Sequence, residues 1–111
     1  MTSDFEEGWQ LLAQDINNTS NNNGFWQAPH SHPIIKIALM MTELSEAIEA
    51  VRHNWPESDH IPNMPLLDEE LADTVIRIMD FAYQYRINLP EAIVAKAIFN
   101  KTRPFMHGKT A

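Results

Sequence analysis

The stretch PIIKIALMMTELSEAIEAVRHN, residues 33–54, decides the fold class of this chain. Its apolar residues recur every three or four positions, which is the spacing of one helix face: Ile37, Met40, Met41, Leu44, Ile48 and Val51. Pro33 suits the first turn of a helix, because its fixed φ is helical and an N–H there would have no partner. We therefore expect a helix that begins near Pro33 and ends at Asn54-Trp55-Pro56.

Helical spacing recurs before this stretch. Ser3 and Glu6 form a capping box that opens a first helix over about residues 4–17. The polar run from Asn17 to Gly24 is expected to be a loop, because asparagine and glycine favour turns over regular structure. That loop continues through Trp26 to the start of the second helix.

The second half of the chain adds two more helices. One is expected from around Leu67-Asp68 to about Arg86, with acids in its first turn, where the helix dipole favours negative charge. Pro90 opens the last helix, and Arg103-Pro104 stops it. The alternation typical of β-strands never persists. The sequence thus predicts a single all-α domain over residues 1–111, with a four-helix bundle-like fold.

The composition narrows the classes of function. The chain has 111 residues and a formal charge of -7, so broad binding to nucleic acid polymers is not expected. Cysteine is absent, which excludes disulfide scaffolds, thiolate zinc sites and cysteine nucleophiles. The N-terminus does not read as a signal peptide, and no apolar run approaches the length of a membrane span, so we expect a cytoplasmic protein. A helical chain this short often completes its core by oligomerising.

Two pairs of carboxylates share the same offset. Glu43 and Glu46 lie three apart in the second expected helix, and Glu70 and Asp73 lie three apart in the third. Residues three apart share a helix face, so packing the two helices together would gather four carboxylates around one cleft. Hard oxygen donors of this kind bind Mg²⁺, which can clamp a polyphosphate and activate water. Each pair alone is more often an ordinary solvated face.

The last expected helix carries a complementary stripe. Lys96, Asn100 and Arg103 lie four and three apart, so they share a face over roughly 10 Å. Lysine, arginine and an amide together suit the binding of phosphate oxygens. The alternative interpretation is that cations simply favour the C-terminal end of a helix.

Together these features resemble the MazG-like family of all-α nucleoside triphosphate pyrophosphohydrolases. The resemblance covers about residues 30–109. It rests on Thr42-Glu43-Leu44-Ser45-Glu46-Ala47 and on Glu69-Glu70-Leu71-Ala72-Asp73. It also rests on the C-terminal segment Asn100-Lys101-Thr102-Arg103-Pro104 and the tail Phe105-Met106-His107-Gly108-Lys109.

The resemblance implies an enzyme that hydrolyses a ribo- or deoxynucleoside triphosphate to the monophosphate and pyrophosphate, in nucleotide-pool housecleaning. The implied cofactor is Mg²⁺, with Mn²⁺ as an alternative, and the implied partner is a second copy in a homodimer or homotetramer. The implied metal ligands are Glu43, Glu46, Glu70 and Asp73. The implied phosphate contacts are Lys96, Asn100 and Arg103. Water would attack the α-phosphorus, with Glu46 as the candidate general base.

Residues near the acid pairs have two interpretations each. Phe25 and Trp26, in the loop before the second helix, would stack on a nucleobase or close the end of the bundle, and Trp26 is our candidate for substrate binding. Arg77 follows Asp73 by one turn, where some relatives carry an aromatic residue. It would bind phosphate or pair with Asp73 or Asp80, and we favour the pair.

Three other functions compete with this one. A phosphoribosyl-ATP pyrophosphohydrolase-type enzyme would use nearly the same chemistry on another substrate. A ferritin-like di-iron bundle needs Glu-x-x-His motifs, which neither acid pair provides. A non-catalytic helical interaction module would use its acidic faces for solubility or for a partner, and it predicts no metal-dependent turnover.

Overall fold

Four α-helices make up the part of the chain that the computed structural model describes, residues 3–27, 29 and 31–104. They are α1 (Asp4–Asn22), α2 (Pro33–Arg52), α3 (Leu66–Gln84) and α4 (Leu89–Asn100). Among these residues there is no β-strand, and one isolated bridge joins Glu57 to Pro65 in the α2–α3 loop. The prediction of an all-α chain is confirmed. Within the described ranges, none of the helices has the length and apolar character that a membrane span requires.

Local signals set the starts of the helices. Ser3 Oγ accepts a hydrogen bond from the backbone N–H of Glu6 at 3.2 Å, which is the serine half of the predicted capping box. Pro33 is the first residue of α2, and His32 Nδ1 caps the helix by accepting from the Ile34 N–H at 3.1 Å. The start of α4 lies one residue before the predicted proline. Local signals were therefore enough to predict the starts of α1, α2 and α4, and the uncapped start of α3 at Leu66 lies within two residues of the predicted one.

The asparagine-rich run belongs to α1, which corrects the prediction of a loop from Asn17 onward. Asn17 is buried, and its amide donates to Asp80 Oδ1 at 2.8 Å and to Gln84 Oε1 at 2.9 Å. Ser20 Oγ donates to the same Asp80 oxygen at 2.8 Å. These bonds to α3 compensate for the low helix propensity of asparagine and serine, so the helix continues to Asn22.

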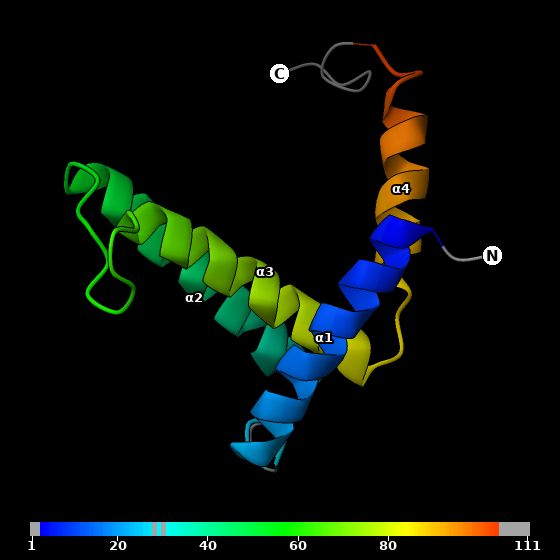
Figure 1. The fold of residues 1–111 in the computed structure, drawn as a ribbon, viewed down its shortest axis with the longest axis horizontal. Coiled ribbons are helices and arrows are strands. Elements are labelled where there is room, and N and C mark those ends of the chain that lie inside the picture. The colour runs from blue at the N-terminus through cyan, green and yellow to red at the C-terminus, as the bar shows by residue number, and fades with distance from the viewer. Residues whose placement is uncertain (1–2, 28, 30, 105–111) are drawn as a thin grey trace.

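The α2–α3 hairpin is the main packed unit of the molecule (Figure 1). The two helices run antiparallel and contact each other along much of their length, and α1 packs across α3. α4 follows the end of α3, contacts α1, and projects away from the hairpin. The acid pairs of α2 and α3 therefore lie on helices that pack together, whereas the basic stripe of α4 lies apart.

The core of the single chain is small and consists largely of alanine. Its buried apolar residues are Ala13, Ala47, Ala50, Met79 and Ala82. The apolar face predicted for α2 is not the face that α3 covers. Most of that face is exposed: Ile37, Met41, Leu44, Ile48 and Val51. A single chain therefore leaves an apolar stripe of α2 in contact with water.

Candidate metal centre and the adjoining pocket

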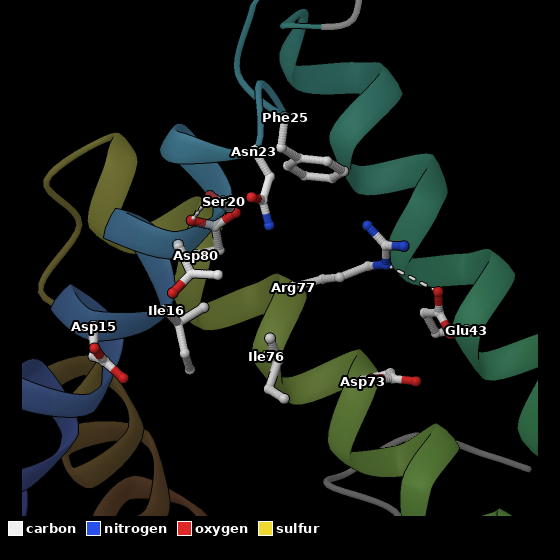
Figure 2. Close-up of a pocket in the computed structure, with 11 residues that line it drawn as sticks. Asp15, Ile16, Ser20, Asn23, Phe25, Glu43, Asp73, Ile76, Arg77 and Asp80 are labelled. Carbon is white, nitrogen blue, oxygen red and sulfur yellow. Dashed lines mark hydrogen bonds and ion pairs between the residues drawn. The ribbon is translucent and has the colours of Figure 1, made fainter. Parts of the chain in front are cut away.

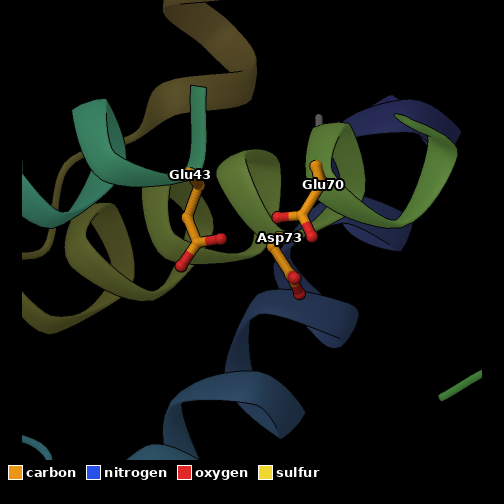
Figure 3. Close-up of side chains that lie close together, drawn as sticks. All are labelled: Glu43, Glu70 and Asp73. Atoms are coloured by element: carbon orange, nitrogen blue, oxygen red, sulfur yellow. The ribbon is translucent and has the colours of Figure 1, made fainter. Parts of the chain in front are cut away.

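Three carboxylates meet where α2 packs on α3. Glu43 projects from α2, and Glu70 and Asp73 project from α3 toward the same point (Figure 3). One oxygen atom of each side chain lies within 4.8 Å of the others, and all three residues are half-buried. This carboxylate triad could hold a divalent metal ion, because such ions favour several hard oxygen donors in one place.

The way α2 is rotated against α3 explains which predicted ligands meet. Glu70 and Asp73 are three apart and share the face of α3 that meets α2. Glu46, the fourth predicted ligand, is exposed and lies outside the triad. An offset of three separates two side chains by about 60° around a helix, in α2 as in α3, so the rotation of α2 against α3 decides that Glu43 joins the triad while Glu46 stays exposed. The structure thus brings together three of the four predicted carboxylates.

Burial and like charge oppose full ionisation of the triad. Burial, together with a hydrogen bond and charge repulsion from Glu43, raises the pKa of Glu70 to about 7. Burial and the charge of Glu43 also raise the pKa of Asp73. A bound cation would relieve this repulsion, so both the donor atoms and the electrostatics of the triad fit a metal ion.

One guanidinium balances part of this charge. Arg77 reaches from α3 to α2, where its Nε donates to Glu43 Oε1 at 3.0 Å. The expected partners of Arg77 were Asp73 and Asp80, so the pair with Glu43 corrects that prediction. The partner depends on how α2 and α3 are set against each other, which residue spacing along one helix does not contain.

A pocket of about 480 Å³ opens beside the triad, between α1, α2 and α3 (Figure 2). Glu43 and Asp73 stand on one side of it, and Ile16 lies on the opposite side. Ile76 and the ring of Phe25 add further apolar surface. The volume and the mixture of apolar walls with a few charged groups are those of a small-molecule site.

Trp26 is tied to the fold and does not line this pocket. Its indole N–H donates to Asp80 Oδ2 at 3.0 Å. Its ring packs against Phe81 and Tyr85, with centroid distances of 6.4 and 5.9 Å. This placement favours the bundle-closing role for Trp26. Phe25, the other aromatic residue of this loop, does line the pocket.

Lys36 is a buried cation that residue spacing did not identify. Its ammonium donates to the backbone carbonyl of Phe25 and lies 3.4 Å from the centroid of the Phe25 ring. The residue is only 3% exposed, and burial lowers its pKa. Lys36 therefore fastens the loop that carries Phe25 onto α2. A lone lysine inside the apolar run of residues 34–41 was the available signal.

Glu69 fastens the α2–α3 loop next to the triad. Its carboxylate accepts hydrogen bonds from Ser58 Oγ and from His60 Nδ1, the latter at 2.8 Å. The Ser58 and His60 hydrogen bonds lower the pKa of Glu69, and the bond to Glu69 raises the pKa of His60. Glu69 is thus engaged with the loop, while its neighbour Glu70 faces α2.

The predicted phosphate-binding stripe lies on the end of α4 and on the turn that follows it, away from the triad. Lys96 Nζ and Arg103 Cζ lie 4.8 and 5.4 Å from the centroid of the Phe99 ring. Asn100 Oδ1 is enclosed and has no hydrogen-bond partner among the described residues. None of the three predicted residues lines the pocket, so one chain does not bring the stripe to the carboxylates. The tail from Phe105 to Lys109 lies outside the described residues.

No protein-family model, no curated protein and no solved structure matches this chain. We therefore classify the molecule by its fold and its candidate site alone. It is an all-α protein whose α2–α3 hairpin carries a carboxylate triad at the edge of a pocket.

Proposed function

We propose that the chain is a metal-dependent hydrolase of polyphosphates, and more specifically a Mg²⁺-dependent nucleoside triphosphate pyrophosphohydrolase. It hydrolyses a ribo- or deoxynucleoside triphosphate to the monophosphate and pyrophosphate, as a cytoplasmic housecleaning enzyme. The observation that carries the proposal is the triad of Glu43, Glu70 and Asp73, with oxygen atoms within 4.8 Å, at the edge of a pocket of about 480 Å³. The resemblance of both acid motifs to MazG-like enzymes supports it.

Each group has a distinct task in this proposal. The triad holds Mg²⁺, or Mn²⁺ in its place; a cation bound there supplies Lewis acidity toward phosphoryl oxygens and water. Glu46 lies one turn after Glu43, exposed and outside the triad. In this proposal its carboxylate accepts the proton of the attacking water. The ring of Phe25 offers a stacking surface for the base within the pocket.

A homodimer or homotetramer is part of the proposal. The exposed apolar stripe of α2 gives a second copy an apolar surface to cover. The phosphate-binding role of Lys96, Asn100 and Arg103 requires such a copy, because α4 lies away from the triad of its own chain (Figure 1).

A substrate panel tests the reaction directly. Purified protein is incubated with ribo- and deoxynucleoside triphosphates and phosphoribosyl-ATP, in Mg²⁺ or in chelator, and in ¹⁸O-labelled water. We expect monophosphate and pyrophosphate only with Mg²⁺. The label should enter the monophosphate, which shows attack at the α-phosphorus. Glu46→Gln should lower kcat by about 10²–10⁴-fold, the usual contribution of a general base.

Two variants separate the site from general charge effects. Glu70→Gln removes a triad carboxylate and should abolish Mg²⁺-dependent turnover. Glu7→Gln makes the same charge change at an exposed position of α1 and should leave turnover unchanged. Diphosphate and phosphate as products would mean attack at the γ-phosphorus and would contradict the proposal. Turnover that survives in chelator or in Glu70→Gln would contradict the role of the triad.

A further inference from the structure

The pocket beside the triad poses an electrostatic problem for a polyphosphate. Four carboxylates contribute to its lining: Asp15, Glu43, Asp73 and Asp80. Among the described residues that line it, Arg77 is the only cation. A metal ion at the triad would neutralise Glu43 and Asp73 but would leave the rest of the lining acidic. A triphosphate in this pocket therefore needs a positive side chain at the boundary between the triad and the pocket.

Arg77 stands at that boundary. Its Nε donates to Glu43 Oε1 at 3.0 Å, which fixes one edge of the guanidinium against the triad. Figure 2 shows one of the other two nitrogen atoms directed toward the side of the pocket where Phe25 lies, and the second directed toward α2. The guanidinium carbon is 5.3 Å from the centroid of the Phe25 ring. In the described part of the chain, neither Nη atom has a hydrogen-bond partner.

The chemistry of this arrangement favours a phosphate as the missing partner. A guanidinium offers paired N–H donors that match two phosphate oxygens, and its pKa keeps it charged. A phosphate bound to a cation at the triad must lie close to Glu43, which Arg77 already contacts. The side chain is 29% exposed, so an incoming anion can reach it, and the partly buried setting reduces competition from water.

We propose that Arg77 is a substrate-binding residue: its two Nη groups bind a phosphate of the nucleoside triphosphate while its Nε stays on Glu43. This inference rests on the proposed function and adds a phosphate contact supplied within a single chain. It also assigns opposite effects to one side chain. Arg77 competes with a cation for Glu43, yet it attracts the anion that the cation carries.

Calorimetry on the intact protein separates these two effects. The probes are Mg²⁺ alone, and the α,β-imido analogues of the four ribonucleoside and the four deoxynucleoside triphosphates in saturating Mg²⁺. These analogues cannot be cleaved at the α–β bond. Arg77→Gln should bind Mg²⁺ alone about two- to fivefold more tightly, because a competing cation is gone. The same variant should bind the best analogue roughly 10- to 100-fold more weakly, the loss expected for a charge-assisted contact.

Two further variants serve as controls. Arg77→Lys keeps the charge but not the paired donors, so it should recover part of the affinity for the analogue. Arg52→Gln removes the same charge from an exposed ion pair with Glu49 and should change neither affinity. Circular dichroism and thermal melting confirm that each variant is folded before it is titrated.

The outcomes distinguish this inference from the proposed function. If the wild-type protein binds none of the analogues in Mg²⁺, the proposed function is wrong, and the role of Arg77 falls with it. If the wild type binds an analogue and Arg77→Gln binds it equally well or better, only the role of Arg77 is wrong. In that case the residue is a structural partner of Glu43.

Discussion

Glu70 shows at the scale of one residue how the triad depends on a cation. Burial and the neighbouring carboxylates raise the pKa of Glu70 to about 7, from 4.5 for an ordinary glutamate. The folded protein therefore binds this proton more tightly than the unfolded chain does. The stabilisation linked to that proton is complete below pH 4.5 and is lost as the pH rises through about 7. Without metal, the triad therefore lowers the stability of the folded protein at neutral pH.

This linkage predicts how pH and Mg²⁺ act on stability. In chelator, the melting temperature should fall as the pH rises from about 5 to above 7, because ionised Glu70 repels Glu43 and Asp73. Mg²⁺ should raise the melting temperature, and should do so more at the upper end of this range, where the triad is ionised and ready to bind. Differential scanning fluorimetry over a pH series, with and without Mg²⁺, measures both effects.

Matched variants attribute the effect to Glu70. Glu70→Gln should flatten the fall in chelator and remove most of the response to Mg²⁺. Asp68→Asn, an exposed acid in the first turn of the same helix, should keep both. A response to Mg²⁺ that is equally large in Glu70→Gln would show that the ion binds elsewhere on this acidic chain.

At the scale of elements, Asp80 joins α1 and the Trp26 loop to α3. Its buried carboxylate accepts hydrogen bonds from the side chains of Asn17, Ser20 and Trp26, at 2.8, 2.8 and 3.0 Å. The last turns of α1 are rich in residues that favour caps and turns, so these bonds are what keeps that segment helical. The wall of the pocket formed by α1 therefore depends on a residue of α3.

Asp80→Ala should consequently destabilise the protein and shorten α1. It removes the acceptor that three buried or half-buried side chains share, while Asn17 keeps its bond to Gln84 and Trp26 keeps a bond to Ser20, so we expect a loss of about 1–3 kcal/mol. Urea unfolding followed by circular dichroism measures the loss, and amide hydrogen exchange should show that protection falls first from Asn17 to Asn22. Glu7→Ala, an exposed change on the same helix, should cost less than about 1 kcal/mol. Equal losses in both variants would contradict the anchoring role of Asp80.

Helix α1 shows which features of the fold the sequence could predict and which it could not. Helix starts were predictable because their signals are local, as with Ser3 and Pro33. The end of α1 was not, because it depends on bonds from Asn17 and Ser20 to a residue about 60 positions away.

The candidate site, too, has parts that residue spacing predicts and parts that depend on tertiary packing. Helical spacing was enough to place Glu70 and Asp73 on one face and to offer Glu43 and Glu46 as their counterparts, but it could not choose between those two. The partner of Arg77 and the exposure of Glu46 depend on how α2 is rotated against α3. That rotation is decided by packing, since α3 covers the small residues Ala47 and Ala50 and leaves the larger apolar side chains outside. Periodicity identified the apolar stripe of α2 but not which partner covers it.

At the scale of the whole molecule, one chain does not make a compact domain. Its radius of gyration is 16.4 Å, whereas a compact chain of this length has about 13 Å. The exposed side chains Ile37, Met41 and Leu44 are spaced four and three apart, and Ile48 and Val51 continue that spacing along α2. This is the repeat of a seam between two packed helices.

The seam predicts self-association, which light scattering coupled to gel filtration measures at micromolar concentration. We expect a dimer or tetramer, because each side chain of this size that leaves water contributes about 1.5–3 kcal/mol. Ile48→Lys places a charge in the seam and should dissociate the assembly and lower the melting temperature. Ser45→Lys makes the same charge change on an exposed polar position of α2 and should leave the assembly intact.

A monomeric wild type would contradict the prediction. The seam would then be an apolar surface that the fold leaves in water, and the stripe of α4 could not reach a triad in any copy.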